Sequence, residues 1–230
     1  MTNSQSATPP SQALHFLYVA DPLCSWCYGF APVMDELARH FADRLPVRVV
    51  MGGLRAGNTK PMRAEDKAYI RDAWTRVAEA SGQRFDMAFF ERDGFVYDTE
   101  PACRAVVTAR EWGASAPATP LAFKARISEA FYGHNRDVTS TDVVIAIAEE
   151  SGFDGPAFRD SFLSAEMKSA TFRDFLTSQE LGVRGFPMLA AGSAEKGYAL
   201  VTNGFRPIDG LIVALEAWLA DGARVTKVSE

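Results

Sequence analysis

The hydrophobic pattern at the start of the chain alternates between short apolar runs and one amphipathic stretch. Residues 14–20 are aromatic and β-branched, which predicts a buried strand ended by the Asp21-Pro22 dipeptide. From about residue 24 to residue 41 apolar side chains recur three and four positions apart, which predicts a helix. A second strand is expected over 47–51. The order strand, helix, strand is typical of a βαβ unit and predicts a parallel pair of strands.

The middle of the chain has a helical pattern. Six amphipathic stretches are expected to be helices, at 64–80, 101–112, 121–132, 143–150, 156–163 and 165–181. After Gly182 the pattern returns to short strands over 188–191 and 198–201, joined by a glycine-bounded hairpin. A last helix is expected over 208–220.

This order of elements predicts an α/β fold built from two separated halves. We expect residues 14–56 and 180–221 to join in one sheet domain, because neither half can bury its sheet face alone. Residues 57–179 would form a helical insertion between them. Residues 1–13 and 222–230 are expected to be flexible tails.

Composition and charge restrict the class of protein. The 230 residues are 47% hydrophobic and carry a formal net charge of −5, without a basic block, so nucleic acid is not an expected partner. The apolar runs are far too short for a membrane span. The first residues lack the basic and apolar segments of a secretory signal. The chain has only three cysteines, too few for a secreted protein held by disulfides. Both observations favour a cytoplasmic protein whose close cysteine pair has a redox function.

The motif Cys24-Ser25-Trp26-Cys27 lies where the first strand passes into the first helix. A C-x-x-C at a first helical turn brings the two sulfurs close enough for a disulfide. The helix start favours the thiolate of the first cysteine, which is the nucleophile. We therefore expect Cys24 at an exposed tip as the attacking thiol and Cys27 as the resolving thiol. Trp26 is expected to shield Cys27 from solvent.

Two other interpretations of the pair stay open at this point. The cysteines could be half of a zinc site, for which Cys103, His15, His40 and His134 are the remaining candidate ligands. None of these forms a second close pair. The two cysteines could also be structural.

A second motif, Gly185-Phe186-Pro187, follows a helix end and precedes a short strand. This places Pro187 at the start of the strand, where no ladder donor is needed. Taken alone, the motif favours an ordinary trans proline in a loop, because cis X-Pro bonds are rare.

The strand, the segment 21–30, the helical insertion and the segment 182–187 together resemble the DsbA-like thioredoxin superfamily. They are most similar to its cytoplasmic FrnE-like branch, whose insertion the segment 99–105 also resembles. The resemblance implies a thioredoxin-like fold with a large inserted all-helical subdomain and catalytic Cys24 and Cys27. It also implies a cis Pro187 in a substrate-binding loop, Gly185 to Pro187, beside the pair.

The resemblance further implies a protein-disulfide oxidoreductase or isomerase acting on protein or small-molecule thiols and disulfides. No metal or organic cofactor is expected beyond the Cys24–Cys27 disulfide, although glutathione is a possible co-substrate. Ser25 and Trp26 replace the Pro-His of strong oxidants and would tune the potential differently. A glutathione-dependent isomerase or transferase, and a chaperone-like binding protein, are the alternatives. Relatives with transferase chemistry typically carry Ser at the nucleophile position, which argues against the first.

Other candidate residues have simpler interpretations. Cys103 lies on an apolar helical stripe with Val106 and Val107, so we expect a buried, unreactive thiol rather than a third redox cysteine. Asp21 is expected to be a plain turn residue rather than a group that tunes the cysteines. Phenylalanines that could line a substrate groove are Phe30, Phe89, Phe90 and Phe186.

Overall fold

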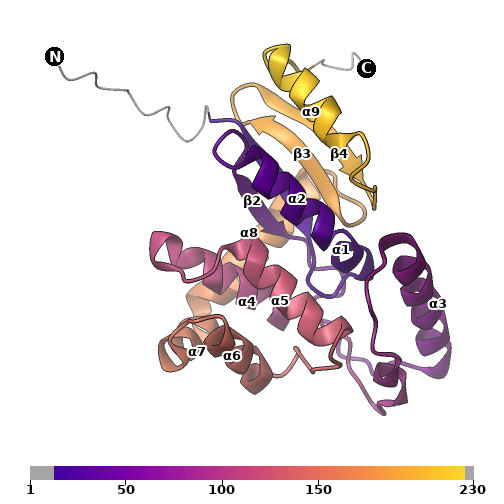
Figure 1. Ribbon diagram of the computed structural model, residues 1–230. Helices are drawn as coiled ribbons and strands as arrows, with labels where there is room; N and C mark the ends of the chain where they lie inside the picture. The colour runs from indigo at the N-terminus through magenta and orange to yellow at the C-terminus, as the bar shows by residue number, and fades with distance from the viewer. Residues whose placement is uncertain (1–12, 226–230) are drawn as a thin grey trace.

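The computed structural model describes residues 13–225, and its centre is one mixed four-stranded sheet. The strands are β1 (His15–Ala20), β2 (Val47–Met51), β3 (Met188–Ser193) and β4 (Gly197–Asn203), in the order β2-β1-β3-β4. β1 and β2 are parallel, whereas β1–β3 and β3–β4 are antiparallel (Figure 1). The predicted parallel pair and the predicted hairpin are both confirmed. Most of the expected tails fall outside the described residues.

The first helical segment is two helices rather than the single helix expected over 24–41. α1 (Ser25–Gly29) ends before Phe30, and α2 (Ala31–Phe41) begins directly after it. The break has a local cause, because Pro32 has no backbone N–H and its ring crowds the carbonyl four residues earlier. The expectation of one continuous helix was wrong, and the cysteine motif has a short helix of its own.

The six helices expected in the middle of the chain are all present, with boundaries shifted by a few residues. They are α3 (Ala64–Ser81), α4 (Glu100–Glu111), α5 (Pro120–Tyr132), α6 (Thr141–Glu150), α7 (Gly155–Leu163) and α8 (Ala165–Glu180). Two short 3-10 turns, Met87–Glu91 and Gly113–Ser115, follow α3 and α4. The last helix, α9 (Leu211–Ala220), starts three residues later than expected.

An ion pair joins the helical block to the edge of the sheet. Arg110 of α4 contacts Asp174 of α8 at 2.7 Å, and the guanidinium also donates to the carbonyl of Val49 in β2 at 3.2 Å. The Asp174 carboxylate accepts a further hydrogen bond from the Met51 N–H at 2.9 Å. The edge strand β2 is therefore covered and hydrogen-bonded by the helices rather than left open.

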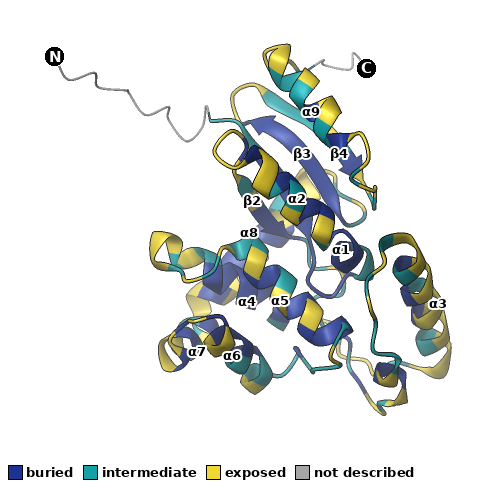
Figure 2. Ribbon diagram, viewed as in Figure 1, coloured by how far each residue is buried: buried dark blue, intermediate teal, exposed yellow. Residues whose placement is uncertain are grey.

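The apolar core runs without interruption from the sheet into the helical block. One cluster of buried side chains includes Phe16 of β1, Leu189 of β3, Cys103 of α4 and Phe131 of α5. In Figure 2 this is visible as dark blue ribbon in β3 and in α4, while the outer face of α3 is yellow. Sheet and helices thus bury their apolar surface in common. Within residues 13–225, every helix is too short or too polar to cross a bilayer.

Candidate active site

The two cysteines of the motif have different positions relative to α1. Cys24 is the residue that precedes the first helical turn, and its side chain is 6% exposed, whereas Cys27 lies one turn inside and is fully buried. Both are thiols. Cys24 therefore precedes the first helical turn and Cys27 lies one turn inside, as expected. The expectation that Cys24 is exposed was wrong. Cys24 lines a cavity of about 260 Å³ together with Leu23, Trp26 and Phe186.

The electrostatic surroundings separate the two thiols. The Cys27 thiol donates a hydrogen bond to Cys24, and this contact is the main reason why the pKa of Cys24 is lowered, against the opposing effect of burial. Burial raises the pKa of Cys27 well above its usual value, and the contact with Cys24 acts in the same direction. Cys24 is therefore favoured as the thiolate and Cys27 as the protonated thiol, which agrees with an attacking and a resolving cysteine.

The loop before β3 passes directly beside the sulfur of Cys24. The carbonyl oxygen of Phe186 lies 3.7 Å from the Cys24 Sγ, and the Phe186–Pro187 peptide is cis, as the resemblance implied. The Phe186 ring packs on the backbone of Gly52, where a Cβ atom would approach the ring to 2.1 Å. Three residues were expected to bind substrate. Phe186 lines the cavity beside Cys24, whereas Gly185 and Pro187 are not among the residues that line it.

Asp21 is a buried hydrogen-bonding centre and not the plain turn residue that we expected. Its carboxylate is fully buried and accepts hydrogen bonds from the Leu23 N–H at 2.8 Å and the Leu54 N–H at 2.6 Å. The thiol of Cys103 lies 3.5 Å from the same carboxylate. Burial raises the pKa of Asp21 and also that of Cys103. Cys103 is buried as predicted, and its lack of reactivity stays a prediction.

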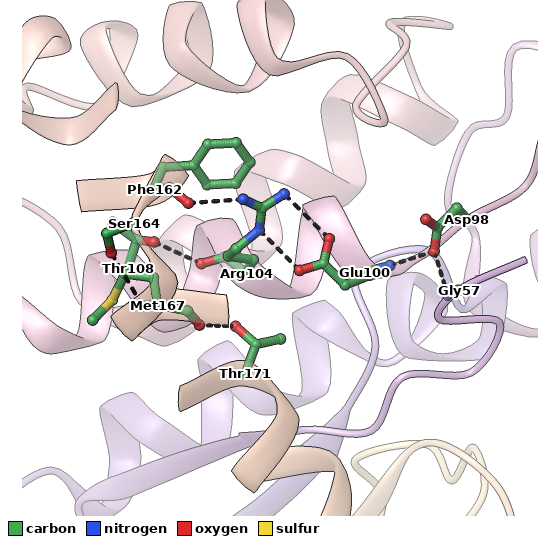
Figure 3. Close-up of polar contacts among 9 residues, drawn as sticks. All are labelled: Gly57, Asp98, Glu100, Arg104, Thr108, Phe162, Ser164, Met167 and Thr171. Carbon is green, nitrogen blue, oxygen red and sulfur yellow. Dashed lines mark hydrogen bonds and ion pairs between the residues drawn. The ribbon is translucent and has the colours of Figure 1, made fainter. Parts of the chain in front are cut away.

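The segment that follows β2 is held in place by the N-terminal end of α4. The Arg55 N–H donates to the Thr99 hydroxyl at 3.2 Å, and the Gly57 N–H donates to Asp98 at 2.8 Å. Asp98 also accepts from the Glu100 N–H, as Figure 3 shows. The helical insertion therefore fixes the backbone of Arg55, which lines the same cavity as Cys24.

The start of α4 is itself fixed by a buried arginine, which Figure 3 places between two helices. The Arg104 guanidinium contacts Glu100 at 2.8 Å and donates to the carbonyl of Phe162, at the end of α7, at 2.8 Å. The same guanidinium lies over the Phe162 ring, 4.1 Å from the ring centroid. A chain of polar contacts thus leads from α7 through α4 to the segment carrying Arg55.

The cavity beside Cys24 combines two cationic side chains with apolar surface. Arg55 and Arg76 both line it, and neither forms an ion pair within residues 13–225. Leu54 is 45% exposed and Tyr69 is 67% exposed at the same cavity. This combination suits an anionic substrate with an apolar portion. Sequence reasoning missed both arginines, because they are far apart in the chain and belong to no motif.

Ser25 and Trp26 line the cavity, and both are half-buried. The Trp26 ring packs against Phe205, which follows β4, at 5.6 Å between centroids. Phe30, Phe89 and Phe90, which we expected in a substrate groove, are instead buried in the core. The groove prediction was therefore wrong for these three, since their rings fill space between elements.

Helix α5 covers the side of the motif that faces away from the cavity. The Lys124 amine donates to the carbonyl of Cys27 at 2.9 Å, and the Ser128 hydroxyl donates to the carbonyl of Pro22 at 2.7 Å. Both side chains are buried, with Lys124 only 1% exposed. Sequence reasoning missed Lys124. Its only signal was a position next to the apolar residues Phe123 and Ile127.

The part of the chain that the structure describes contains no group of three or more His, Cys, Asp or Glu side chains that could hold a metal ion. The site consists of a cysteine pair at the start of α1, which follows β1, the first strand of the mixed sheet, in the chain. The loop that carries Phe186 and Pro187 lies beside the sulfur of Cys24. Together these features define a protein of the thioredoxin-like class with a helical insertion between the two halves of its sheet.

Comparison with known proteins gives the family. The model of the DSBA-like thioredoxin domain matches residues 17–215, and the chain belongs to that family. Proteins of this family use redox-active cysteines.

Two solved proteins are similar over nearly their whole length. A candidate protein disulfide isomerase from Nitrosomonas europaea is 34% identical, with a TM-score of 0.82 over 91% of this chain and 99% of that one. The cytosolic disulfide reductase DsbM from Pseudomonas aeruginosa is 26% identical, with a TM-score of 0.73 over 90% and 98%. A second structure of DsbM was determined with GSH.

Curated relatives have a different described role. The ClpXP adapter protein SpxH of Halalkalibacterium halodurans is 25% identical over 167 residues, which are 71% of this chain and 53% of that protein. SpxH of Bacillus subtilis is 24% identical over 181 residues, which are 78% and 58%. The chain therefore spans between about half and three fifths of the length of these relatives.

Proposed function

We propose that this chain is a thiol–disulfide oxidoreductase in which Cys24 attacks a disulfide and Cys27 releases the product. The observation that carries the proposal is the difference between the two thiols. Cys24 lines a cavity and has a lowered pKa, whereas Cys27 is fully buried and has a raised pKa. A thiolate that a substrate can approach and a protected second thiol are what sequential disulfide exchange requires.

In the reductive direction, the Cys24 thiolate attacks one sulfur of the substrate disulfide and the other sulfur leaves as a thiolate. Cys27 then attacks Cys24, which forms the Cys24–Cys27 disulfide and releases the reduced substrate. The reverse sequence oxidises a dithiol. The carbonyl of Phe186, 3.7 Å from the Cys24 sulfur, is a hydrogen-bond acceptor for a bound peptide-like substrate.

We assign small anionic disulfides, with glutathione disulfide as the reference compound, as substrates. Arg55 and Arg76 supply positive charge at the cavity, and Leu54 and Tyr69 supply apolar surface. The existence of a DsbM structure with GSH supports this choice. DsbM is described as cytosolic, which supports a cytoplasmic location for this chain as well. Retention of both cysteines favours disulfide exchange over a glutathione-dependent isomerisation.

The test is reduction of glutathione disulfide by the reduced protein, followed by mass spectrometry of acid-quenched samples. We expect a protein–glutathione adduct at Cys24 that decays to the intramolecular disulfide. The Cys24→Ser variant should form neither species. Failure of the wild-type protein to react, or an adduct on Cys27 ahead of Cys24, would contradict the proposal.

A second candidate function is non-catalytic protein binding, which the similarity to the SpxH adapters favours. The exposed Leu54 and Tyr69 beside the cavity would then be part of a binding surface. The two candidates make different predictions for Cys24→Ser. An adapter would keep its partner in a pull-down with this variant, whereas a disulfide exchange enzyme would lose every captured protein.

A further inference from the structure

A second cavity, of about 280 Å³, lies between α2 and α5, and α5 is below α2 in the view of Figure 1. It has no lining residue in common with the cavity of Cys24. Its lining changes from exposed to buried, because Asp35 and Arg39 are exposed, whereas Tyr18 and Lys124 are 0% and 1% exposed. The cavity therefore has a mouth at the surface and a floor that contains two buried polar side chains.

The walls of this cavity are apolar and consist largely of small side chains. They are formed by Ala31, Met34 and Ala38 of α2 and by Leu121, Ala122 and Ala125 of α5. Four of these six residues are alanines, whose side chains are too short to fill the space between the two helices. An engineered apolar cavity of about 150 Å³ binds benzene, so a cavity of about 280 Å³ has room for a larger apolar body.

The hydroxyl of Tyr18 is an unsatisfied group on the cavity floor. It is fully buried and has no hydrogen-bond partner among the described residues. A buried hydroxyl without a partner loses the hydrogen bonds that it would make with water, which costs free energy. A phenol can both donate and accept a hydrogen bond. The hydroxyl is therefore available to a polar group that enters the cavity.

Lys124 is the second polar group on the floor. Its amine donates to the carbonyl of Cys27 at 2.9 Å, which uses one of the three donors of an ammonium group. Within residues 13–225 no carboxylate forms an ion pair with Lys124. The buried carboxylate at the cysteine motif, Asp21, instead accepts hydrogen bonds from the N–H groups of Leu23 and Leu54. Because a lysine is almost never fully buried without a partner of opposite charge, the floor offers a place for an anion.

We propose that the cavity between α2 and α5 binds a small monocarboxylic acid, whose carboxylate accepts hydrogen bonds from Lys124 and Tyr18 and whose apolar body lies against the walls. A carboxylate has two oxygens, so it can accept from the amine and from the hydroxyl at the same time. An apolar pocket with a few convergent polar groups is the usual form of a small-molecule site. The site is separate from the cavity of Cys24, and the inference goes beyond the proposed function.

The chemistry of the cavity disfavours other occupants. A cation would meet the amine of Lys124 on the floor, and a dicarboxylate would bring a second charge against apolar walls that cannot pair with it. At the mouth, Asp35 lies 3.7 Å from Arg39, so the charges there balance each other. Ordered water needs two to four polar partners for each molecule, which is more than Tyr18 and Lys124 supply for this volume.

Isothermal titration calorimetry of the reduced protein with hexanoate measures the affinity. Hexan-1-ol, which has the same carbon chain and no charge, is the matched ligand. We expect hexanoate to bind at least about tenfold more tightly than hexan-1-ol, because hydrogen bonds to a charged group are the stronger ones. Bound hexanoate should also raise the melting temperature of the protein.

Two substitutions test the floor of the cavity. Lys124→Met should lower the affinity for hexanoate to that for hexan-1-ol and leave the affinity for hexan-1-ol unchanged, because the walls stay intact. Tyr18→Phe should weaken hexanoate binding about tenfold. Circular dichroism and thermal melting establish that each variant is folded. If Lys124→Met does not fold, Tyr18→Phe still decides, since unchanged hexanoate binding in that variant contradicts the proposal.

A pair of alanine substitutions tests the location of the site. Ala38→Leu fills the cavity between α2 and α5 and should abolish hexanoate binding. Ala73→Leu makes the same change at the cavity of Cys24 and should leave hexanoate binding unchanged. Cys24→Ser should also bind hexanoate like the wild type, because the site does not depend on disulfide exchange.

Three results would overturn the proposal. Absence of saturable hexanoate binding would mean that the cavity holds water only. Equal affinities for hexanoate and hexan-1-ol would show that the floor does not bind the carboxylate. Loss of binding in Ala73→Leu, with binding retained in Ala38→Leu, would place the acid in the cavity of Cys24. If hexanoate binds as expected and the protein does not reduce glutathione disulfide, the proposed function fails and this inference stands.

Discussion

The carbonyl oxygen of Phe186 lies 3.7 Å from the sulfur of Cys24, although 162 residues separate them in the chain. This contact brings the loop between α8 and β3 back to the start of α1. In the proposed function it also sets a backbone acceptor beside the nucleophile, so that a substrate would bind along the loop while its disulfide meets Cys24. The contact depends on Gly52, because any side chain there would collide with the Phe186 ring.

The first prediction concerns the order of the two cysteines. Cys27→Ser should accumulate a stable mixed disulfide on Cys24, because no thiol is left to resolve it. Cys24→Ser should have no disulfide reductase activity, since Cys27 is buried and its pKa is raised. Mass spectrometry of adducts formed with glutathione disulfide measures both outcomes.

Cys103 is the internal control for this experiment. It is fully buried and its pKa is raised by burial, so native protein should not be alkylated there under mild conditions. Rapid labelling of Cys103, or a disulfide between Cys103 and either motif cysteine, would show that the thiol takes part in the chemistry.

The second prediction concerns the pH dependence of Cys24 alkylation. Above its pKa a thiol is a reactive thiolate, so a lowered pKa should move the midpoint of the iodoacetamide rate profile below the free-cysteine value of about 8.5. The main cause is the hydrogen bond from the Cys27 thiol. Cys27→Ala removes this donor and should move the midpoint to higher pH, whereas Cys27→Ser keeps a donor and should move it less. Identical midpoints in the two variants would exclude this cause.

The sequence alone was sufficient where the information is local. Cys24 and Cys27 lie three positions apart at a strand-to-helix junction, and that spacing alone brings the two sulfurs together. The helices of the insertion were predicted because apolar side chains recur at helical spacing. The interruption of the helix at Phe30 also has a local cause in Pro32. It was not predicted, because the amphipathic pattern continues across it.

The remainder of the site depends on contacts between distant segments. Lys124 meets Cys27 from a helix that begins almost a hundred residues later, and a lysine in an amphipathic pattern is ordinarily placed in solvent. Arg55 reaches the cavity because Thr99 holds its backbone. In the sequence Asp21 has the features of a turn residue. Only the folded structure brings Leu54 and Cys103 into contact with its carboxylate. No periodicity or spacing encodes these pairings, because tertiary packing decides them.

The third prediction concerns the two arginines at the cavity of Cys24. Arg55→Gln and Arg76→Gln should each raise the KM for glutathione disulfide about two- to fivefold, as expected for charge pairs close to solvent, and leave kcat unchanged. The KM of the wild-type protein should rise with salt. Steady-state kinetics at several ionic strengths measure these effects.

Two controls make this result specific. Arg71→Gln removes the same charge from α3 outside the cavity and should have little effect. A neutral substrate, hydroxyethyl disulfide, should show the same KM with all variants. An equal rise in KM for the neutral disulfide would mean that the substitutions disturb the shape of the cavity rather than its charge.

The fourth prediction concerns stability. Asp174→Ala leaves Arg110 without its partner and removes the acceptor of the Met51 N–H, so the free energy of unfolding should fall by about 3 kcal/mol. Asp142→Ala breaks the exposed ion pair with Arg159 and should cost less than about 1 kcal/mol. Urea denaturation of the two variants measures the difference. Equal costs would show that the contact with the edge strand adds nothing beyond a surface ion pair.

The last prediction concerns the reduction potential of the Cys24–Cys27 pair. The lowered pKa of Cys24 stabilises the thiolate, and therefore the reduced form, so the potential should lie above the value of about −270 mV for thioredoxin. It should stay below about −120 mV, the value for DsbA, because Ser25 and Trp26 bring no cation to the sulfur. Equilibration with glutathione buffers, read out by thiol labelling, measures the potential.

Trp26→His adds a group that can carry positive charge next to Cys24 and should raise the potential, whereas Trp26→Phe should not. A potential outside this range, or an equal shift in both variants, would mean that the charge at this dipeptide does not set the stability of the thiolate.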